Sequence, residues 1–156
     1  ALDRFYRRTV AEHGGFDYLR PGFFERAAQL LPDTMLFARA SKDGRVVAGA
    51  VFFETDSALY GRYWGCDEDL ECLHFEVAYY AAIERCIERG LTLFEAGAQG
   101  QHKLVRGFEP SLTHSVHLLV DQGFDRAIRG FMAQEEMEVA GHIKQLAGSG
   151  PYRSEE

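Results

Sequence analysis

The sequence predicts an α/β domain of the α+β type, built on a mixed sheet, and three observations support this fold class. Residues 34–40 and 45–55 are strand-like runs separated by a polar turn, which is typical of an antiparallel hairpin. A long helical pattern at 73–89 lies between strand-like segments at 58–65 and 91–96, an arrangement that places two strands parallel. The 156 residues, of which 46% are apolar, suffice for one hydrophobic core.

Two helices are expected before the hairpin. Apolar residues recur at helical spacing from residue 2 to residue 13, and Gly14 and Gly15 end the pattern. Pro21 suits the first turn of a second, shorter helix, which Pro32 closes. These helices should flank the sheet.

Glycines are expected at a turn and a bulge of the sheet and at the end of the central helix. Gly44 lies in the hairpin turn, where a positive φ is needed, and Gly49 is expected to mark a β-bulge. The helix at 73–89 is apolar on several sides in its first half, so it should be the central, buried helix. Gly90 follows it at the position of a left-handed cap.

The last third of the chain is less regular. Residues 97–110 are rich in glycine and have room for one helical turn. Residues 112–120 alternate between apolar and polar side chains, which predicts a further strand. Residues 124–146 are expected to form an amphipathic terminal helix that flanks the fold.

We expect a single domain over residues 1–147 and a flexible tail over 148–156. The chain starts with Ala1, which suggests a segment of a longer, two-domain protein whose N-terminal domain is missing here. No apolar run approaches the roughly 20 residues needed to cross a bilayer, and residues 1–5 lack the apolar stretch of a signal peptide. We therefore expect a cytoplasmic protein that does not insert into membranes.

Charge and cysteine content exclude several classes of protein. The formal net charge of -7 argues against DNA binding, because affinity for a polyanion comes from clustered Lys and Arg. Three cysteines form no C-x-x-C pair, which favours reduced thiols over a disulfide scaffold or a thiolate metal site. His114 and His117 fall on opposite faces of the strand expected at 112–120, so we predict no zinc site.

A basic segment stands out in this acidic chain. His102, Lys103 and Arg106 can share one side of a helical turn, and glycines lie on both sides of that turn. Such a cluster could hold a phosphate or carboxylate, with Arg making a forked contact. Alternatively, Lys103 and Arg106 are solvated or paired with Glu95 or Glu109. The segment is not a P-loop, because no Gly-Lys-Ser/Thr follows.

Two carboxylates are candidates for proton transfer. Glu76 lies with His74 near the start of the central helix, among apolar residues where an ionisable group needs a partner. Glu95 ends a strand just before the basic segment, a common place for a functional side chain in α/β sheets. Both groups have an alternative structural role: Glu76 at the helix N-terminus or in solvent, and Glu95 as the ion-pair partner of Arg106.

Three motifs carry a family resemblance. They are LHFEVAYY at 73–80, FEAGAQG at 94–100 and HKLVRGF at 102–108. They resemble the C-terminal half of FemAB-like proteins of peptidoglycan biosynthesis or recognition, and the element order is similar to the GNAT-type acyltransferase fold. True Fem-type enzymes have a basic stretch that ends in Gly-Phe-Gly; here Glu109 replaces the final Gly.

The resemblance implies transfer of an acyl or aminoacyl group to an amine acceptor. Fem-type enzymes take amino acids from aminoacyl-tRNA and attach them to a peptidoglycan precursor. For such a transfer the type and position of the residues make Glu76 or Glu95 the candidate general base, assisted by His102, because an attacking ammonium must lose a proton to a positioned acceptor. The residues expected to bind the anionic precursor are Gln99, Gly100, His102, Lys103, Arg106, Gly107 and Phe108.

An acyl-CoA cofactor is not expected in its usual groove. GNAT acetyltransferases hold the cofactor pyrophosphate with a glycine-rich loop before the central helix. Here the same position, residues 66–72, has four carboxylates and no glycine, so it should repel a pyrophosphate. Three alternatives stay open: a non-catalytic binding module for an anionic cell-wall precursor, an ordinary acetyl-CoA-dependent N-acetyltransferase, and a structural half that forms a homodimer.

Overall fold

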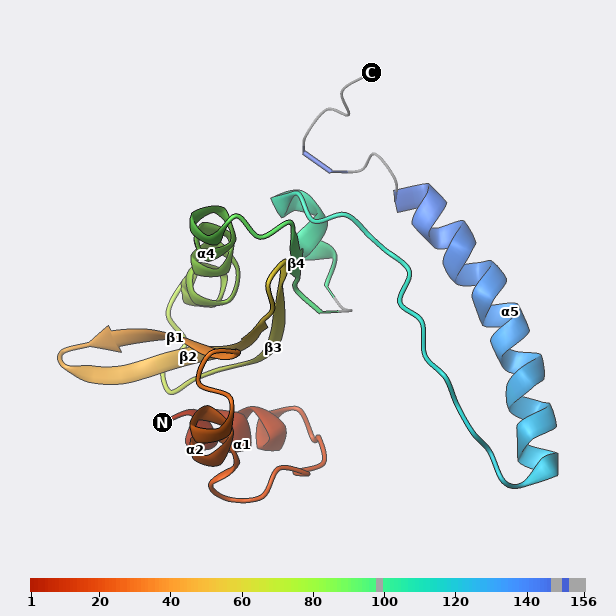
Figure 1. The fold of residues 1–156 in the computed structure, drawn as a ribbon, viewed down its shortest axis with the longest axis horizontal. Helices are drawn as coiled ribbons and strands as arrows, with labels where there is room; N and C mark the ends of the chain where they lie inside the picture. Colours follow the sequence, from red (N-terminus) through yellow and green to blue (C-terminus); the bar gives the residue numbers. More distant parts are fainter. Residues whose placement is uncertain (98–99, 147–149, 152–156) are drawn as a thin grey trace. The chain divides into compact units, whose positions relative to one another are not determined.

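The computed structural model describes residues 1–97, 100–146 and 150–151. The chain divides into two compact units, Ala1–Ala98 and Gln99–Glu156, and each is described by itself (Figure 1). The first unit holds two helices, the sheet and the central helix, and the second holds the basic segment and the terminal helix. The expectation of one domain over residues 1–147 stays a prediction.

The sheet of the first unit has four strands, and it confirms the predicted mixed sheet. In the order in which they pair, these are β1 (Met35–Lys42), β2 (Arg45–Glu54), β3 (Ala58–Cys66) and β4 (Leu93–Glu95). The pairs β1/β2 and β2/β3 are antiparallel, as expected for the hairpin and the strand that follows it. The pair β3/β4 is parallel, as expected for strands joined by a helix.

Helices cover both faces of the sheet (Figure 1). On one side are α1 (Leu2–Glu12) and α2 (Phe23–Leu30). On the other is one continuous helix, composed of α3 (Leu73–Phe75), a π-helical turn η1 (Glu76–Tyr80) and α4 (Ala81–Arg89). Gly90, at φ 66°, caps this helix through its N–H group, as predicted.

Strand β2 explains why the sheet needs both layers. Its residues from Val47 to Phe52 are all buried, although side chains alternate between the two faces. Ala50 and Phe52 pack in the cluster that includes Val77 of the central helix. Val51 packs with Tyr6 of α1 in the opposite cluster. A strand covered on both faces is therefore apolar throughout rather than alternating.

Gly49 has a different role from the bulge that the sequence predicts. It pairs directly with Arg39 on one side and with Gly65 on the other, and the register shifts occur elsewhere, at Ala40/Ser41 and Val51/Phe52. A Cβ atom on Gly49 would lie 3.0 Å from the side chain of Leu2. The bulge prediction is wrong: Gly49 is a regularly paired residue at a point where α1 packs closely on the sheet.

The second unit contains a 3₁₀ helix and one long α-helix. The 3₁₀ helix η2 covers Gln101–Arg106, and α5 covers Gln122–Leu146. The carboxylate of Asp121 accepts the N–H of Phe124 at 2.7 Å, so it caps the start of α5. No helix within the described ranges is long and apolar enough to cross a membrane.

The strand predicted at residues 112–120 is wrong. This segment is extended but belongs to no sheet in the described part of the chain. Its apolar residues Val116, Leu118 and Val120 are each at least 92% exposed. Alternation predicts which side chains share a face, but a strand also needs a neighbour for its backbone hydrogen bonds.

Candidate functional site

The basic segment is helical, as the sequence predicts, but it forms a 3₁₀ helix of six residues, which is about two turns and not one. Lys103 and Arg106 are three residues apart in η2, and in a 3₁₀ helix such residues lie one above the other. The guanidinium of Arg106 donates to the carbonyl of His102 at 2.7 Å. Lys103 and Arg106 therefore share one side of η2, and Arg106 also contacts the backbone of His102.

Gly107 and Phe108 end this turn. Gly107 is left-handed at φ 85°, and its N–H donates to the carbonyl of Leu104 at 3.0 Å. The N–H of Phe108 donates to the carbonyl of Lys103 at 3.2 Å. These two bonds form a Schellman motif, which only a residue tolerant of positive φ can make without strain.

The His102 ring lies directly against Gly100. Its φ of 111° disfavours any residue with a side chain. A Cβ atom on Gly100 would lie 2.4 Å from Cε1 of His102, which is closer than such atoms can approach. The imidazole therefore packs against the glycine, so Gly100 acts on the site through His102. Gln99, also a candidate binding residue, lies outside the described residues.

The charges of Lys103 and Arg106 act on the His102 ring. Partial burial lowers the pKa of His102 from its ordinary value, and repulsion by Lys103 and Arg106 lowers it further. The lowered pKa favours the neutral imidazole, which can accept a proton or a hydrogen bond. The turn thus presents two permanent cations beside one neutral acceptor.

Glu76 lies in the first unit, at the start of the π-helical turn, and its side chain is exposed. The preceding His74 is half-buried, and its ring lies 4.9 Å from the Trp64 ring and 5.3 Å from the Tyr79 ring. A π-helical turn inside an α-helix is often found at functional sites. The sequence predicts the helix here but not the π turn.

Glu95 ends β4, as predicted, and is half-buried. Its carboxylate accepts the N–H of Gly97 at 3.1 Å. This bond holds the side chain over the first residues that follow the strand. The exposed Glu76 and the half-buried Glu95 are both carboxylates that could accept a proton, and nothing in their own contacts selects one as a base.

The acidic loop before the central helix is partly neutralised. Asp67 forms an ion pair with Arg4 at 2.5 Å, which lowers the pKa of the Asp67 carboxyl, and Glu68 pairs with Lys42 at 2.8 Å. The remaining carboxylates of the loop, Asp69 and Glu71, have no such ion pair among the described residues. The loop thus has a structural role that the sequence alone does not indicate.

Sequence reasoning also missed a buried ion pair and a surface groove. Glu54 is the one buried charged side chain of the described core, and it pairs with Arg85. A carboxylate at the end of the apolar run of β2 is a signal that could have indicated the ion pair.

A groove of about 540 Å³ lies at residues 18–26, where the sequence shows two arginines among aromatic residues. No three His, Cys, Asp or Glu side chains of the described part could hold a metal ion.

A family model described as FemAB-like, peptidoglycan biosynthesis/recognition, matches residues 1–154. The chain belongs to the FemAB-like family. This membership confirms the resemblance carried by the motifs at 73–80, 94–100 and 102–108. In this FemAB-like protein the third motif is η2 with its Schellman cap, and the first includes the π-helical turn.

Comparison with curated proteins finds no match. Among solved structures, the FemAB-like chain is similar to a ribosomal-protein-alanine N-acetyltransferase from Brucella melitensis biovar Abortus 2308. The TM-score is 0.48 and the sequence identity 16%, over 66% of this chain and 81% of that chain. A likeness this remote carries no inference about the activity of this protein.

Proposed function

We propose that this FemAB-like protein is an acyl- or aminoacyltransferase that acts on an amine acceptor, and that the acceptor is a peptidoglycan precursor. The observation that carries the proposal is the basic turn, which presents Lys103 and Arg106 on one side of η2 next to a neutral His102. Membership of a family described for peptidoglycan biosynthesis or recognition supports the class of substrate.

Lys103 and Arg106 would hold an anionic part of the precursor. A guanidinium offers two parallel N–H donors to a phosphate, and an ammonium adds a compact charge. Gly100 and Gly107 keep the turn in a shape that residues with side chains would strain. The candidate binding residues Gln99 and Phe108 complete the segment in this proposal.

The transfer itself needs a proton acceptor. The acceptor's ammonium first loses a proton, and the amine nitrogen then forms a bond to the acyl carbonyl carbon. The bond from that carbon to the donor's oxygen or sulfur breaks, and the leaving group takes up a proton. Glu76 or Glu95 would serve as the base, with His102 as an assisting acceptor. No covalent enzyme intermediate is required.

The acyl donor in this proposal is an aminoacyl ester, the kind of donor that Fem-type enzymes use, and not acetyl-CoA. Asp69 and Glu71 keep negative charge in the loop where a CoA-binding protein would place glycines, and like charge repels a pyrophosphate. We therefore expect no saturable acetyl-CoA binding at micromolar concentrations. Calorimetric titration giving a micromolar Kd would contradict this and favour an ordinary N-acetyltransferase.

The test starts with binding of a UDP-linked peptidoglycan precursor, measured as a thermal shift, and continues with an acyl-transfer assay. Ligand that binds only the folded state raises its stability, by about 2.7 kcal/mol at a hundredfold excess over Kd. Lys103→Ala/Arg106→Ala should lose both the shift and the transfer. The matched control, Arg126→Ala/Lys144→Ala, removes the same charges from α5 and should keep both. If the two double variants behave alike, Lys103 and Arg106 are not part of the binding site.

A binding module without catalysis is the second candidate, because the family description names recognition alongside biosynthesis. It predicts the same precursor-dependent shift and the same loss in Lys103→Ala/Arg106→Ala. It differs in predicting no turnover with any aminoacyl or acyl donor. Transfer that depends on Glu76 or Glu95 would reject it.

A further inference from the structure

A second candidate binding site lies on the first unit, in the connection between α1 and α2. The groove at residues 18–26 has a volume of about 540 Å³, within the range of small-molecule sites. Its walls come from one short stretch of chain, so the first unit alone builds it. The lining residues are Tyr18, Leu19, Arg20, Pro21, Gly22, Phe23 and Arg26.

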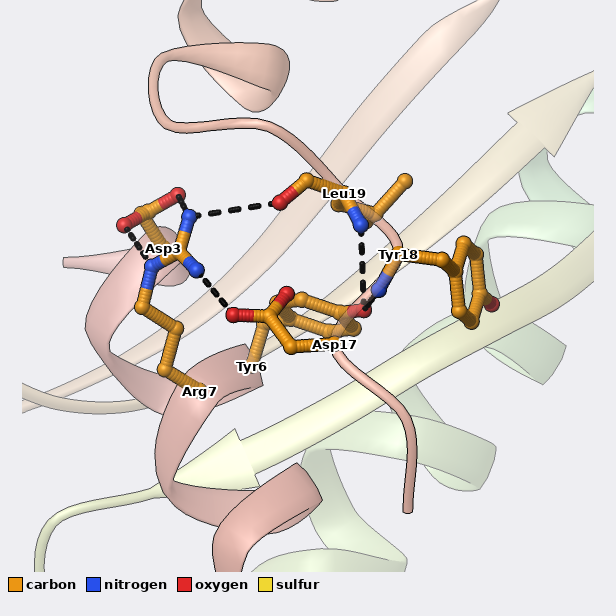
Figure 2. A network of polar contacts seen from close by, with 6 residues as sticks. All are labelled: Asp3, Tyr6, Arg7, Asp17, Tyr18 and Leu19. Carbon is orange, nitrogen blue, oxygen red and sulfur yellow. Dashed lines mark hydrogen bonds and ion pairs between the residues drawn. The ribbon is translucent and has the colours of Figure 1, made fainter.

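One wall of the groove is held in place by a polar network (Figure 2). The hydroxyl of Tyr6 accepts the backbone N–H groups of Tyr18 and Leu19, at 3.3 and 3.4 Å. Arg7 bridges Asp3 and Asp17 and also donates to the carbonyl of Leu19 at 3.4 Å. The segment that forms the wall is thereby fixed to α1.

The aromatic side chains that line the groove are fixed as well. The Tyr18 hydroxyl contacts the Tyr63 hydroxyl and accepts a bond from Arg62 at 3.0 Å. The Phe23 ring packs edge-on against the buried Phe24 ring, with centroids 5.4 Å apart. Both lining rings keep exposed area, 53% for Tyr18 and 36% for Phe23. Fixed, exposed rings offer flat apolar surface without an ordering cost on binding.

The groove also carries unneutralised positive charge. Arg20 and Arg26 are exposed, and within the described residues no carboxylate lies at ion-pair distance from either. The nearby Asp17 is already engaged by Arg7. Gly22 precedes α2 without a side-chain cap, but Glu25 in the first turn offsets the positive end of that helix, so the positive charge of the groove comes from the two arginines. In a protein of net charge -7, two such arginines in one groove are complementary to an anion.

We propose that this groove binds a phosphate ester that also carries a planar ring, as nucleoside monophosphates do. Arg20 and Arg26 hold the phosphate, since guanidinium groups match its oxygens with paired donors. The ring stacks against Tyr18 and Phe23, since every planar ring has a face that an aromatic side chain can accept. The groove shares no residue with the basic turn, and this proposal does not depend on the proposed transfer.

The test is calorimetric titration of the whole chain with AMP, adenosine and inorganic phosphate. AMP should bind saturably and at least tenfold more tightly than either fragment. Arg20→Ala/Arg26→Ala should raise the Kd for AMP at least tenfold. The control Arg39→Ala/Arg45→Ala removes two exposed arginines from the hairpin and should leave the Kd unchanged. Phe23→Leu keeps the apolar character of the side chain but removes the ring. It should weaken the binding of AMP severalfold and leave the binding of inorganic phosphate unchanged.

Each contrary result overturns the proposal. Absence of saturable AMP binding rejects the site, and unchanged affinity in Arg20→Ala/Arg26→Ala rejects the role of the arginines. Equal affinity for phosphate and AMP rejects the ring contact, and equal affinity for adenosine and AMP rejects the phosphate contact. Loss of AMP binding in Lys103→Ala/Arg106→Ala instead would assign the nucleotide to the basic turn. Melting temperatures of all variants exclude unfolding as the cause.

Discussion

Glu54 and Arg85 form a two-point ion pair that ties the central helix to the sheet. Nε of Arg85 lies 2.8 Å from Oε2 of Glu54, and Nη2 lies 3.1 Å from Oε1. The Glu54 side chain is 7% exposed, whereas that of Arg85 is 39% exposed. Arg89 adds a third contact, at 3.3 Å. A buried carboxylate is tolerated only with such partners, so Glu54 depends on Arg85 at this position.

We expect Arg85→Ala to destabilise the protein by about 1–3 kcal/mol, because the buried carboxylate loses its two-point partner. Arg89→Ala should cost less, about 0–1 kcal/mol, because that side chain makes one longer contact and is mostly exposed. Urea unfolding measures both free energies. Arg129→Ala, which removes an exposed pair within α5, is the surface control. Equal costs at Arg85 and Arg89 would contradict this account.

The same ion pair predicts a loss of stability in acid. Hydrogen bonding by Arg85 lowers the pKa of Glu54 below its ordinary value, despite the opposing effect of burial. The folded state therefore binds this proton less readily than the unfolded state does. The stabilisation is complete above the unfolded pKa and is lost as the pH falls below about 5 toward the lower folded pKa. The difference in unfolding free energy between the wild type and Glu54→Gln should shrink over that range; a constant difference would refute the linkage.

Two glycines of β3 form a matched pair for a packing test. A Cβ on Gly65 would lie 2.8 Å from Cβ of Phe5 and 2.9 Å from its carbonyl oxygen, so α1 would have to move. A Cβ on Gly61 would meet its nearest neighbour at an ordinary 3.5 Å. Gly65→Ala should cost about 1–3 kcal/mol, a shift in Tm of roughly 2–4 °C per kcal/mol, whereas Gly61→Ala should be near neutral. Thermal unfolding of the two variants tests this, and similar Tm values would argue against close packing of α1.

The basic turn predicts a coupled titration. Because Lys103 and Arg106 contribute to lowering the pKa of His102, Lys103→Ala and Arg106→Ala should each raise it toward its ordinary value. The midpoint can be followed by the NMR shift of the His102 ring proton. Arg126→Ala, in α5, is the control and should not move it. An unchanged midpoint in both basic-turn variants would show that the charges of Lys103 and Arg106 do not act on the His102 ring.

Local patterns in the sequence determine most of the secondary structure of this protein. The hairpin, the third strand, the central helix with its Gly90 cap and the terminal helix all form where the pattern predicts. The basic turn is also local, since His102, Lys103 and Arg106 meet through helical spacing of a few residues. Such features are predictable because backbone propensity and near-neighbour contacts decide them.

Only the tertiary structure decided the features that depend on distant partners. In the sequence Gly49 suggests a bulge. In the structure it lies where α1, more than 40 residues away along the chain, packs on the sheet. Residues 112–120 alternate like a strand, yet without a paired neighbour they form none. The groove at residues 18–26 exists because Tyr6 and Arg7 hold its wall, and the carboxylate of Glu54 is neutralised from 31 residues along the chain. Alternation and spacing specify which side chains share a face, whereas the partner that the face meets is specified by packing across the whole core.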